Sequence, residues 1–144
     1  MSMYGEKPLT LTLTYLGAVP FLAAALATLL SIGGTFPAQT FLAYGAVISA
    51  FMAGTAWMQG QAFSVQPKQL LLLSNAAALI AFSALISPAP LKLSLAMQAI
   101  AFIALLYCDY LVAGQGKQPA WYFAMRRNVT MIVLGTYAVM FVAG

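Results

Sequence analysis

The sequence contains very little charge. Only 6% of its 144 residues are Asp, Glu, Lys or Arg, whereas 63% are hydrophobic. A water-soluble domain carries about 25% charged residues, which solvate its surface. The composition therefore excludes an ordinary water-soluble domain and predicts an integral membrane protein. The charged residues are Glu6, Lys7, Lys68, Lys92, Asp109, Lys117, Arg126 and Arg127.

Metal-binding and nucleophilic side chains are also scarce. The chain has no His, one Cys and two acidic residues. This set cannot build a structural zinc site, a di-iron site or a His-ligated haem, and a serine nucleophile would have no His as its base. We interpret Cys108 as a small buried apolar side chain. We therefore expect no metal, no cofactor and no enzymatic activity.

Long apolar runs make up most of the chain. Crossing a hydrocarbon core about 30 Å thick takes about 20 helical residues. Apolar residues occupy consecutive positions, as in residues 76–82, whereas a membrane barrel alternates apolar and polar residues. Gly and Pro separate the runs. We predict one all-α integral membrane domain over residues 1–144, a bundle of five transmembrane helices at 9–32, 38–58, 69–86, 91–112 and 120–142.

The basic residues are unevenly distributed between the two ends of these spans. If the spans alternate in direction, Lys92 lies alone at one side of the membrane. The others, Lys7, Lys68, Lys117, Arg126 and Arg127, lie at or near the opposite side. Basic residues favour the cytoplasmic side, so we expect a multi-pass protein of the cell inner membrane with its N-terminus in the cytoplasm. A nucleic-acid partner is not expected, because no water-exposed basic face exists.

Asp109 is the acidic residue inside a predicted span, about one turn from its end. A carboxylate inside the membrane is costly and is usually paired. We predict that the last two spans form an antiparallel hairpin with an ion pair between Asp109 and Arg126. Eleven residues deeper, about three helical turns, each helix returns to the same face. This places Gln98 opposite Tyr137. The charged pair could be structural or could bind a ligand or a proton.

Other polar and aromatic residues fall in the same half of the predicted bundle. They are Asn75, Trp57, Trp121 and Tyr122. With Asp109 and Arg126 they form a candidate ligand site. For the aromatic residues the alternative is an interfacial belt, and for Asn75 it is a hydrogen bond to a neighbouring helix.

Small residues recur every fourth position in the second predicted span. Gly45, Ser49 and Ala53 form one such face. Small residues let helix backbones approach closely in membranes. We predict close helix packing at this face, either within the chain or between subunits.

Four segments resemble one family of small bacterial membrane proteins. They are LGAVPF at 16–21, YGAVISAFMAGTAW at 44–57, Asp109 after its apolar run, and WYFAMRRNVT at 121–130. The family is domain of unknown function three-four-two-nine, and its eukaryotic relative is the mitochondrial inner-membrane transmembrane protein sixty-nine. The resemblance implies a small multi-spanning membrane protein and no particular activity.

Two function hypotheses follow. The first is a non-enzymatic subunit or assembly partner of a larger inner-membrane complex, such as a respiratory complex. It would contact lipid and other membrane subunits or further copies of itself. The alternative is a small transporter or a lipid- or quinone-binding protein that uses a cytoplasmic-side pocket around Asp109.

The charge bias makes a prediction about topology. Alkaline phosphatase fused after Gly144 should be active, because an odd number of spans would place it in the periplasm. A green fluorescent protein fused at the same position should be dark. The reverse pattern would contradict both the orientation and the odd span count.

Overall fold

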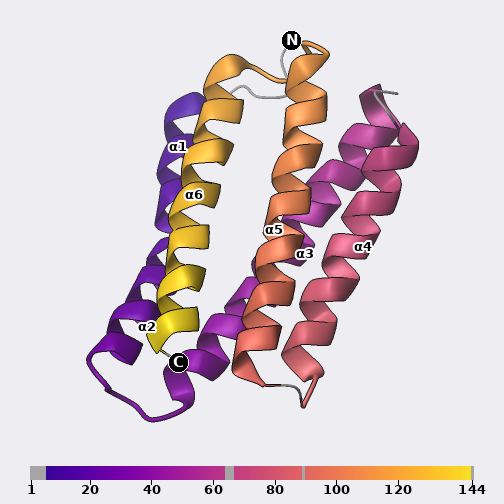
Figure 1. The fold of residues 1–144 in the computed structure, drawn as a ribbon. Helices are drawn as coiled ribbons and strands as arrows, with labels where there is room; N and C mark the ends of the chain where they lie inside the picture. The colour runs from indigo at the N-terminus through magenta and orange to yellow at the C-terminus, as the bar shows by residue number, and fades with distance from the viewer. Residues whose placement is uncertain (1–5, 64–66, 89, 144) are drawn as a thin grey trace.

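The computed structural model describes residues 6–63, 67–88 and 90–143. In this part of the chain every regular element is an α-helix (Figure 1). The helices are α1 (Lys7–Leu16), α2 (Val19–Leu29), α3 (Phe36–Phe63), α4 (Pro67–Ile86), α5 (Leu91–Gly114) and α6 (Ala120–Ala143).

The first predicted span, 9–32, is divided into α1 and α2. The break falls at residues 17–18, just before Pro20, which has no backbone N–H to donate to the preceding turn. The hydroxyl of Tyr44 on α3 donates a hydrogen bond of 2.8 Å to the carbonyl oxygen of Gly17. A neighbouring helix thus satisfies a backbone group at the break, as an apolar environment requires.

The second predicted span ends too early, because α3 continues from Met58 to Phe63. The predicted spans 38–58 and 69–86 leave residues 59–68 as a connection, and Gly60 is one of the glycines predicted to separate them. In the structure Gly60 lies inside the helix and is buried. A Cβ atom at this position would lie 3.1 Å from the Cβ of Leu70 on α4. The glycine therefore permits close packing of α3 on α4. The other three predicted spans agree with α4, α5 and α6 to within two residues at each end.

The protein is a helical membrane bundle. Within the described residues, four segments are long and apolar enough to cross a membrane: Lys7–Leu29, Phe36–Ala62, Lys68–Ile86 and Leu91–Gly114. Helix α6 has the same length as α5. Its first half contains Arg126, Arg127 and Asn128, which make it less apolar. That α6 is a fifth span stays a prediction.

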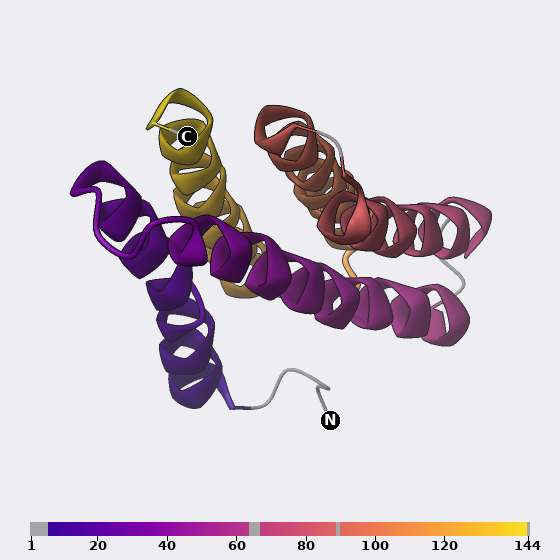
Figure 2. The same cartoon turned by 90° about the horizontal axis from the view of Figure 1, so that it is seen from below.

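Helix α3 crosses the bundle obliquely behind α5 and α6 (Figure 1) and connects its two sides. Seen from below (Figure 2), α2 and α6 lie toward one end of α3 and α4 and α5 toward the other. Helix α6 packs against both α5 and α2, whereas α1 packs against α6. The beginning of α1 and the end of α6 therefore lie at opposite ends of the bundle (Figure 1).

The small-residue face of α3 packs inside the chain. Gly45, Ser49 and Ala53 are all buried. Ala53 belongs to an apolar cluster with residues of α4 and α5, including Ala81 and Leu105. Of the two interpretations of this face, packing within the chain is therefore the one that the structure shows.

Gln98 joins four helices at the centre of the bundle. It lies on α5 and is fully buried. Its Nε2 donates to the carbonyl oxygens of Leu42 on α3, at 2.9 Å, and Ala81 on α4, at 3.3 Å. Its Oε1 accepts a 2.6 Å hydrogen bond from the hydroxyl of Tyr137 on α6. The predicted apposition of Gln98 and Tyr137 is confirmed.

Gly45 makes this junction possible, which can be tested. A Cβ atom there would lie closer than 3.0 Å to both Tyr137 Oη and Gln98 Oε1. We expect Gly45→Ala to lower the free energy of unfolding by about 1–3 kcal/mol, the usual cost of overpacking, as measured by unfolding in mixed micelles. The control is Gly54→Ala on the same helix, where nothing lies within 4 Å of the added Cβ. Equal stability of the two variants would contradict the close approach.

Candidate functional site

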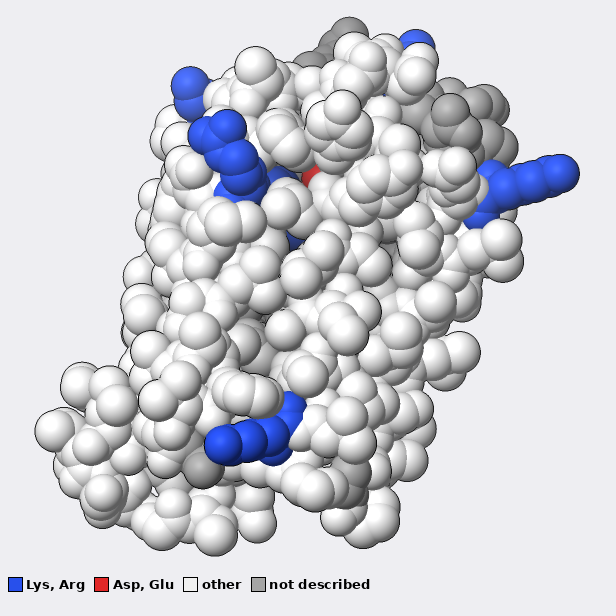
Figure 3. Space-filling view, viewed as in Figure 1, with Lys and Arg blue, Asp and Glu red and all other residues white. Residues whose placement is uncertain are grey.

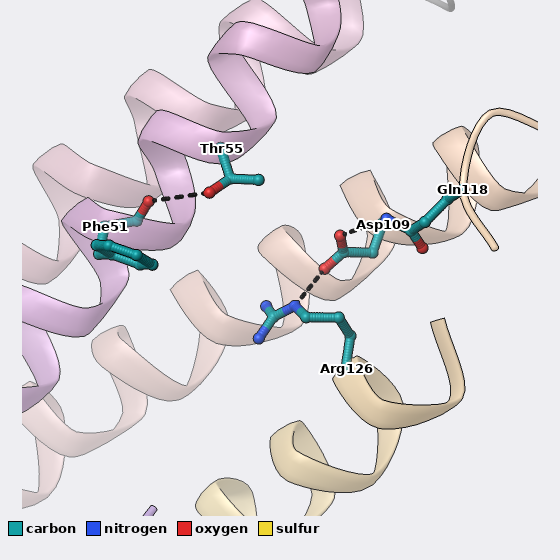
Figure 4. A network of polar contacts seen from close by, with 5 residues as sticks. All are labelled: Phe51, Thr55, Asp109, Gln118 and Arg126. Atoms are coloured by element: carbon teal, nitrogen blue, oxygen red, sulfur yellow. Dashed lines mark hydrogen bonds and ion pairs between the residues drawn. The ribbon is translucent and has the colours of Figure 1, made fainter. Parts of the chain in front are cut away.

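The predicted ion pair between α5 and α6 is present. Arg126 Nε donates to Asp109 Oδ2 at 3.0 Å (Figure 4). The two side chains are only 5% and 8% exposed. A paired arrangement is expected, because either charge alone would be costly inside an apolar bundle. The hairpin register worked out from the sequence is therefore correct at both Asp109 and Gln98.

Gln118 is a third member of this cluster, and sequence reasoning missed it. It lies in the turn before α6 and is buried. Its Nε2 donates to Asp109 Oδ1 at 3.1 Å, so both carboxylate oxygens of Asp109 accept a hydrogen bond. In the sequence it is an ordinary polar residue of a short connection. Only the folding of the turn back over the end of α5 brings it to the carboxylate.

The nitrogens of the Arg126 guanidinium point in different directions. Its Nε faces Asp109, whereas its two terminal nitrogens point away from the carboxylate, toward the side where α3 passes (Figure 4). Arginine carries five N–H donors in a planar fork. The ion pair therefore fixes the orientation of the side chain through Nε. The two terminal nitrogens, which we call its outer edge, take no part in the pair.

Arg126 also lines a cavity of about 500 Å³. Its wall is formed by parts of α1, α2, α3, α5 and α6 and is mostly apolar. The cavity is lined by Thr10, Leu13, Thr14, Gly17, Phe21, Tyr44, Ile48, Phe51, Met52, Thr55, Phe102, Tyr122, Arg126, Val129, Thr130 and Val133. Arg126 is the charged residue of this lining.

Threonines from three helices also line the cavity. Thr10 and Thr14, four residues apart on α1, share one face and both line it, as do Thr55 on α3 and Thr130 on α6. The Thr55 hydroxyl donates to the carbonyl of Phe51, one turn earlier, at 3.4 Å (Figure 4). Sequence reasoning overlooked Thr10, Thr14 and Thr55 because hydroxyl side chains are common in membrane helices and carry no distinctive spacing.

The remaining predicted site residues separate into two groups. Tyr122 lines the Arg126 cavity. Trp121 lies beside it, with Lys7 Nζ at 5.7 Å from the centroid of the indole ring. This contact connects the first turns of α1 and α6 at the end of the bundle. It agrees with an interfacial position for Trp121.

The expectation that Asn75 lies near Asp109 is wrong. Asn75 and Trp57 are exposed and line a separate hollow of about 220 Å³ between α3 and α4. The Asn75 amide donates to the carbonyl of Leu71 in its own helix, at 2.9 Å, and not to a neighbouring helix. The prediction used only the position of Asn75 along its helix. Position along a helix does not determine which face of the helix a residue occupies.

The basic residues gather at one end of the molecule. Figure 3 shows blue side chains at the end where α1 and α6 begin and a single one near the opposite end. By position in the chain the latter is Lys92, at the start of α5. This distribution agrees with the topogenic bias deduced from the sequence. No group of three or more His, Cys, Asp or Glu residues in the described part of the chain could hold a metal ion.

The fold and the site define a class: a multi-pass helical membrane protein with a buried ion pair beside an apolar cavity. The family described as Protein of unknown function (DUF3429) matches residues 7–142. The chain belongs to this family, as its sequence segments suggested. No curated protein and no solved structure matches it.

The ion pair predicts a non-additive pattern of stabilities. Asp109→Ala strands Arg126, and Arg126→Leu strands Asp109. We expect each to cost about 2.5–3.5 kcal/mol, the cost of an unpaired charge in a membrane helix. The double variant should recover much of this loss, because removing both partners of a buried pair is often tolerated.

The measurement is a double-mutant cycle of unfolding free energies in bicelles. Arg127→Leu serves as the control, because Arg127 is exposed on the same helix, and it should have a small effect. Additive losses at Asp109 and Arg126 would show that the pair contributes no coupling energy.

Proposed function

We propose that this protein is a non-enzymatic membrane protein that binds an amphipathic, lipid-like small molecule in the cavity at Arg126. One observation carries the proposal: a buried arginine, paired through Nε alone among its described contacts, lines a mostly apolar cavity, and its terminal nitrogens point away from its partner Asp109. An amphipathic molecule would place its polar group at these nitrogens and its apolar part along the walls.

The size and chemistry of the cavity support this function. Small-molecule sites commonly have volumes of about 300–1,000 Å³, with apolar walls and a few polar groups that orient the ligand. The cavity here is about 500 Å³. Its apolar walls include Phe21, Phe102 and Val133, all of which are buried. The polar groups are Arg126 and the threonines described above.

The cavity has an edge at the outer surface of the bundle. Leu13 on α1 and Phe51 on α3 both line it, yet they are 59% and 69% exposed. These residues therefore stand at its outer edge, between α1 and α3. In a membrane bundle such a surface faces the hydrocarbon, and a lipid-like molecule could enter from the bilayer without passing through water.

The proposed setting is the cell inner membrane. In it, α6 forms the fifth span, and the N-terminus together with the basic end of the bundle faces the cytoplasm. The polar group of the bound molecule would then lie in the cytoplasmic half of the membrane, at the depth of Arg126. The predicted role as a subunit or assembly partner of a larger complex stays a prediction.

A cavity-filling substitution tests the proposal. Ile48 on α3 lines the cavity, whereas its neighbour Val47 points outward and is 64% exposed. Native mass spectrometry of the protein, extracted in a mild detergent, should reveal a bound small molecule. Ile48→Trp should abolish this adduct because the indole occupies the cavity, and Val47→Trp should retain it.

Two results would count against binding in this cavity. One is an adduct that persists unchanged in Ile48→Trp. The other is unmodified protein that carries no small molecule and instead copurifies with other polypeptides in fixed stoichiometry. The latter would favour the subunit role.

A further inference from the structure

We propose that the molecule bound in the Arg126 cavity has an uncharged, flat head group with a carbonyl oxygen, as in a quinone, and not an anionic head group. This inference rests on the proposed function and narrows its ligand class. Three features of the cavity carry it: its charge balance, its hydrogen-bonding groups and its aromatic wall.

The charge of Arg126 is already balanced. Asp109 lies 3.0 Å from its Nε, so the pair has no net charge when both groups are ionised. In the cavity lining described above, Arg126 is the sole charged residue. A phosphate or carboxylate head group would therefore add an uncompensated negative charge in an apolar interior, which is costly. A neutral head group leaves the balance unchanged.

Other cations of this end of the molecule do not line the cavity. Lys7 lies over the ring of Trp121, and Arg127 is exposed on another face of α6. A site for an anionic lipid would be expected to bring several cations together, as basic lipid-binding pockets do. Here the described cavity lining contains one cation, Arg126, and Asp109 neutralises it.

The polar groups of the cavity suit an acceptor. A guanidinium only donates hydrogen bonds, and the terminal nitrogens of Arg126 point away from Asp109 (Figure 4). Thr130, one turn further along α6, adds a hydroxyl to the same lining. A carbonyl oxygen accepts hydrogen bonds and carries no charge, so it matches these donors without disturbing the ion pair.

The wall of the cavity is rich in aromatic rings. The ring centroid of Phe21 lies 4.9 Å from that of Tyr44 and 5.9 Å from that of Phe102, both in edge-to-face geometry. All three line the cavity. Aromatic rings attract one another in stacked or edge-to-face arrangements beyond simple area burial. A flat conjugated head group fits such a wall better than the flexible backbone of a glycerolipid does.

Two ligands with the same tail test the head-group class. The protein is delipidated in a mild detergent and mixed with decylubiquinone or decyl phosphate at equal mole fraction, and adducts are quantified by native mass spectrometry. We expect decylubiquinone to bind at least about tenfold more tightly. Its carbonyl oxygen can accept hydrogen bonds from Arg126 without adding charge, whereas the phosphate adds an unbalanced negative charge to an apolar interior. Ile48→Trp should lose the quinone adduct, which locates it in the cavity.

Arg126→Lys examines the role of the guanidinium fork. Lysine keeps a positive charge beside Asp109 but lacks the planar second edge. We expect a loss of quinone binding with little change in melting temperature, and no change in binding for Arg127→Lys. If Arg126→Lys does not fold, the comparison of the two ligands on the unmodified protein still decides the head-group class.

The outcomes separate this inference from the function on which it rests. Tighter binding of decyl phosphate, displaced by Ile48→Trp, would overturn the uncharged head group and leave the cavity as a lipid site. Absence of both adducts, with a native lipid still displaced by Ile48→Trp, would overturn the quinone class alone. Absence of both adducts and of any Ile48-sensitive lipid would overturn the proposed function as well.

Discussion

The bundle depends on satisfying the polar side chains of α5 in an interior that excludes water. Gln98 and Asp109 lie on one face of this helix, three turns apart, and each is buried. Polar groups without partners cost several kcal/mol in such surroundings. Gln98 forms hydrogen bonds to α3, α4 and α6. Asp109 accepts hydrogen bonds from Arg126 and Gln118.

These contacts hold α5 and α6 in one register, and the rest of the structure follows from it. Tyr137, fixed by its bond to Gln98, also packs against the aromatic rings of Phe21 and Phe41, at 5.9 and 4.6 Å between centroids. The same face of α6 that pairs with α5 therefore holds α2 and α3. Helix α1, on the N-terminal side of the break near Pro20, also packs against α6. Residues of α1 and α3 line the cavity together with residues of α2, α5 and α6.

Arg126 therefore connects stability with the proposed binding. Its Nε pairs with Asp109 across the hairpin, and the same residue lines the cavity. A lysine would supply charge but not two separate edges. If the bound molecule is uncharged, as we propose, the arginine can hold it without loosening the ion pair. Arg126 would then both pair with Asp109 and hold the bound molecule.

The sequence by itself determined the membrane environment, the approximate positions of the long helices and the register of one helix pair. The scarcity of charge predicted a membrane bundle. The similar depth of the two charges in an antiparallel hairpin placed Asp109 opposite Arg126, and the helical period then placed Gln98 opposite Tyr137. These relations are local to two consecutive helices. A periodic pattern is sufficient to specify them.

Only the tertiary structure decided which helices meet elsewhere. Asn75 has the right depth for the site but faces away from it, since rotation of α4 is set by its packing on α3 and α5. Gly60 resembles a turn residue, yet close contact with Leu70 makes it part of a longer helix. Gln118 and the α1 threonines reach the site through a turn and a helix break. Their positions depend on contacts between distant segments, which residue spacing along one chain does not encode.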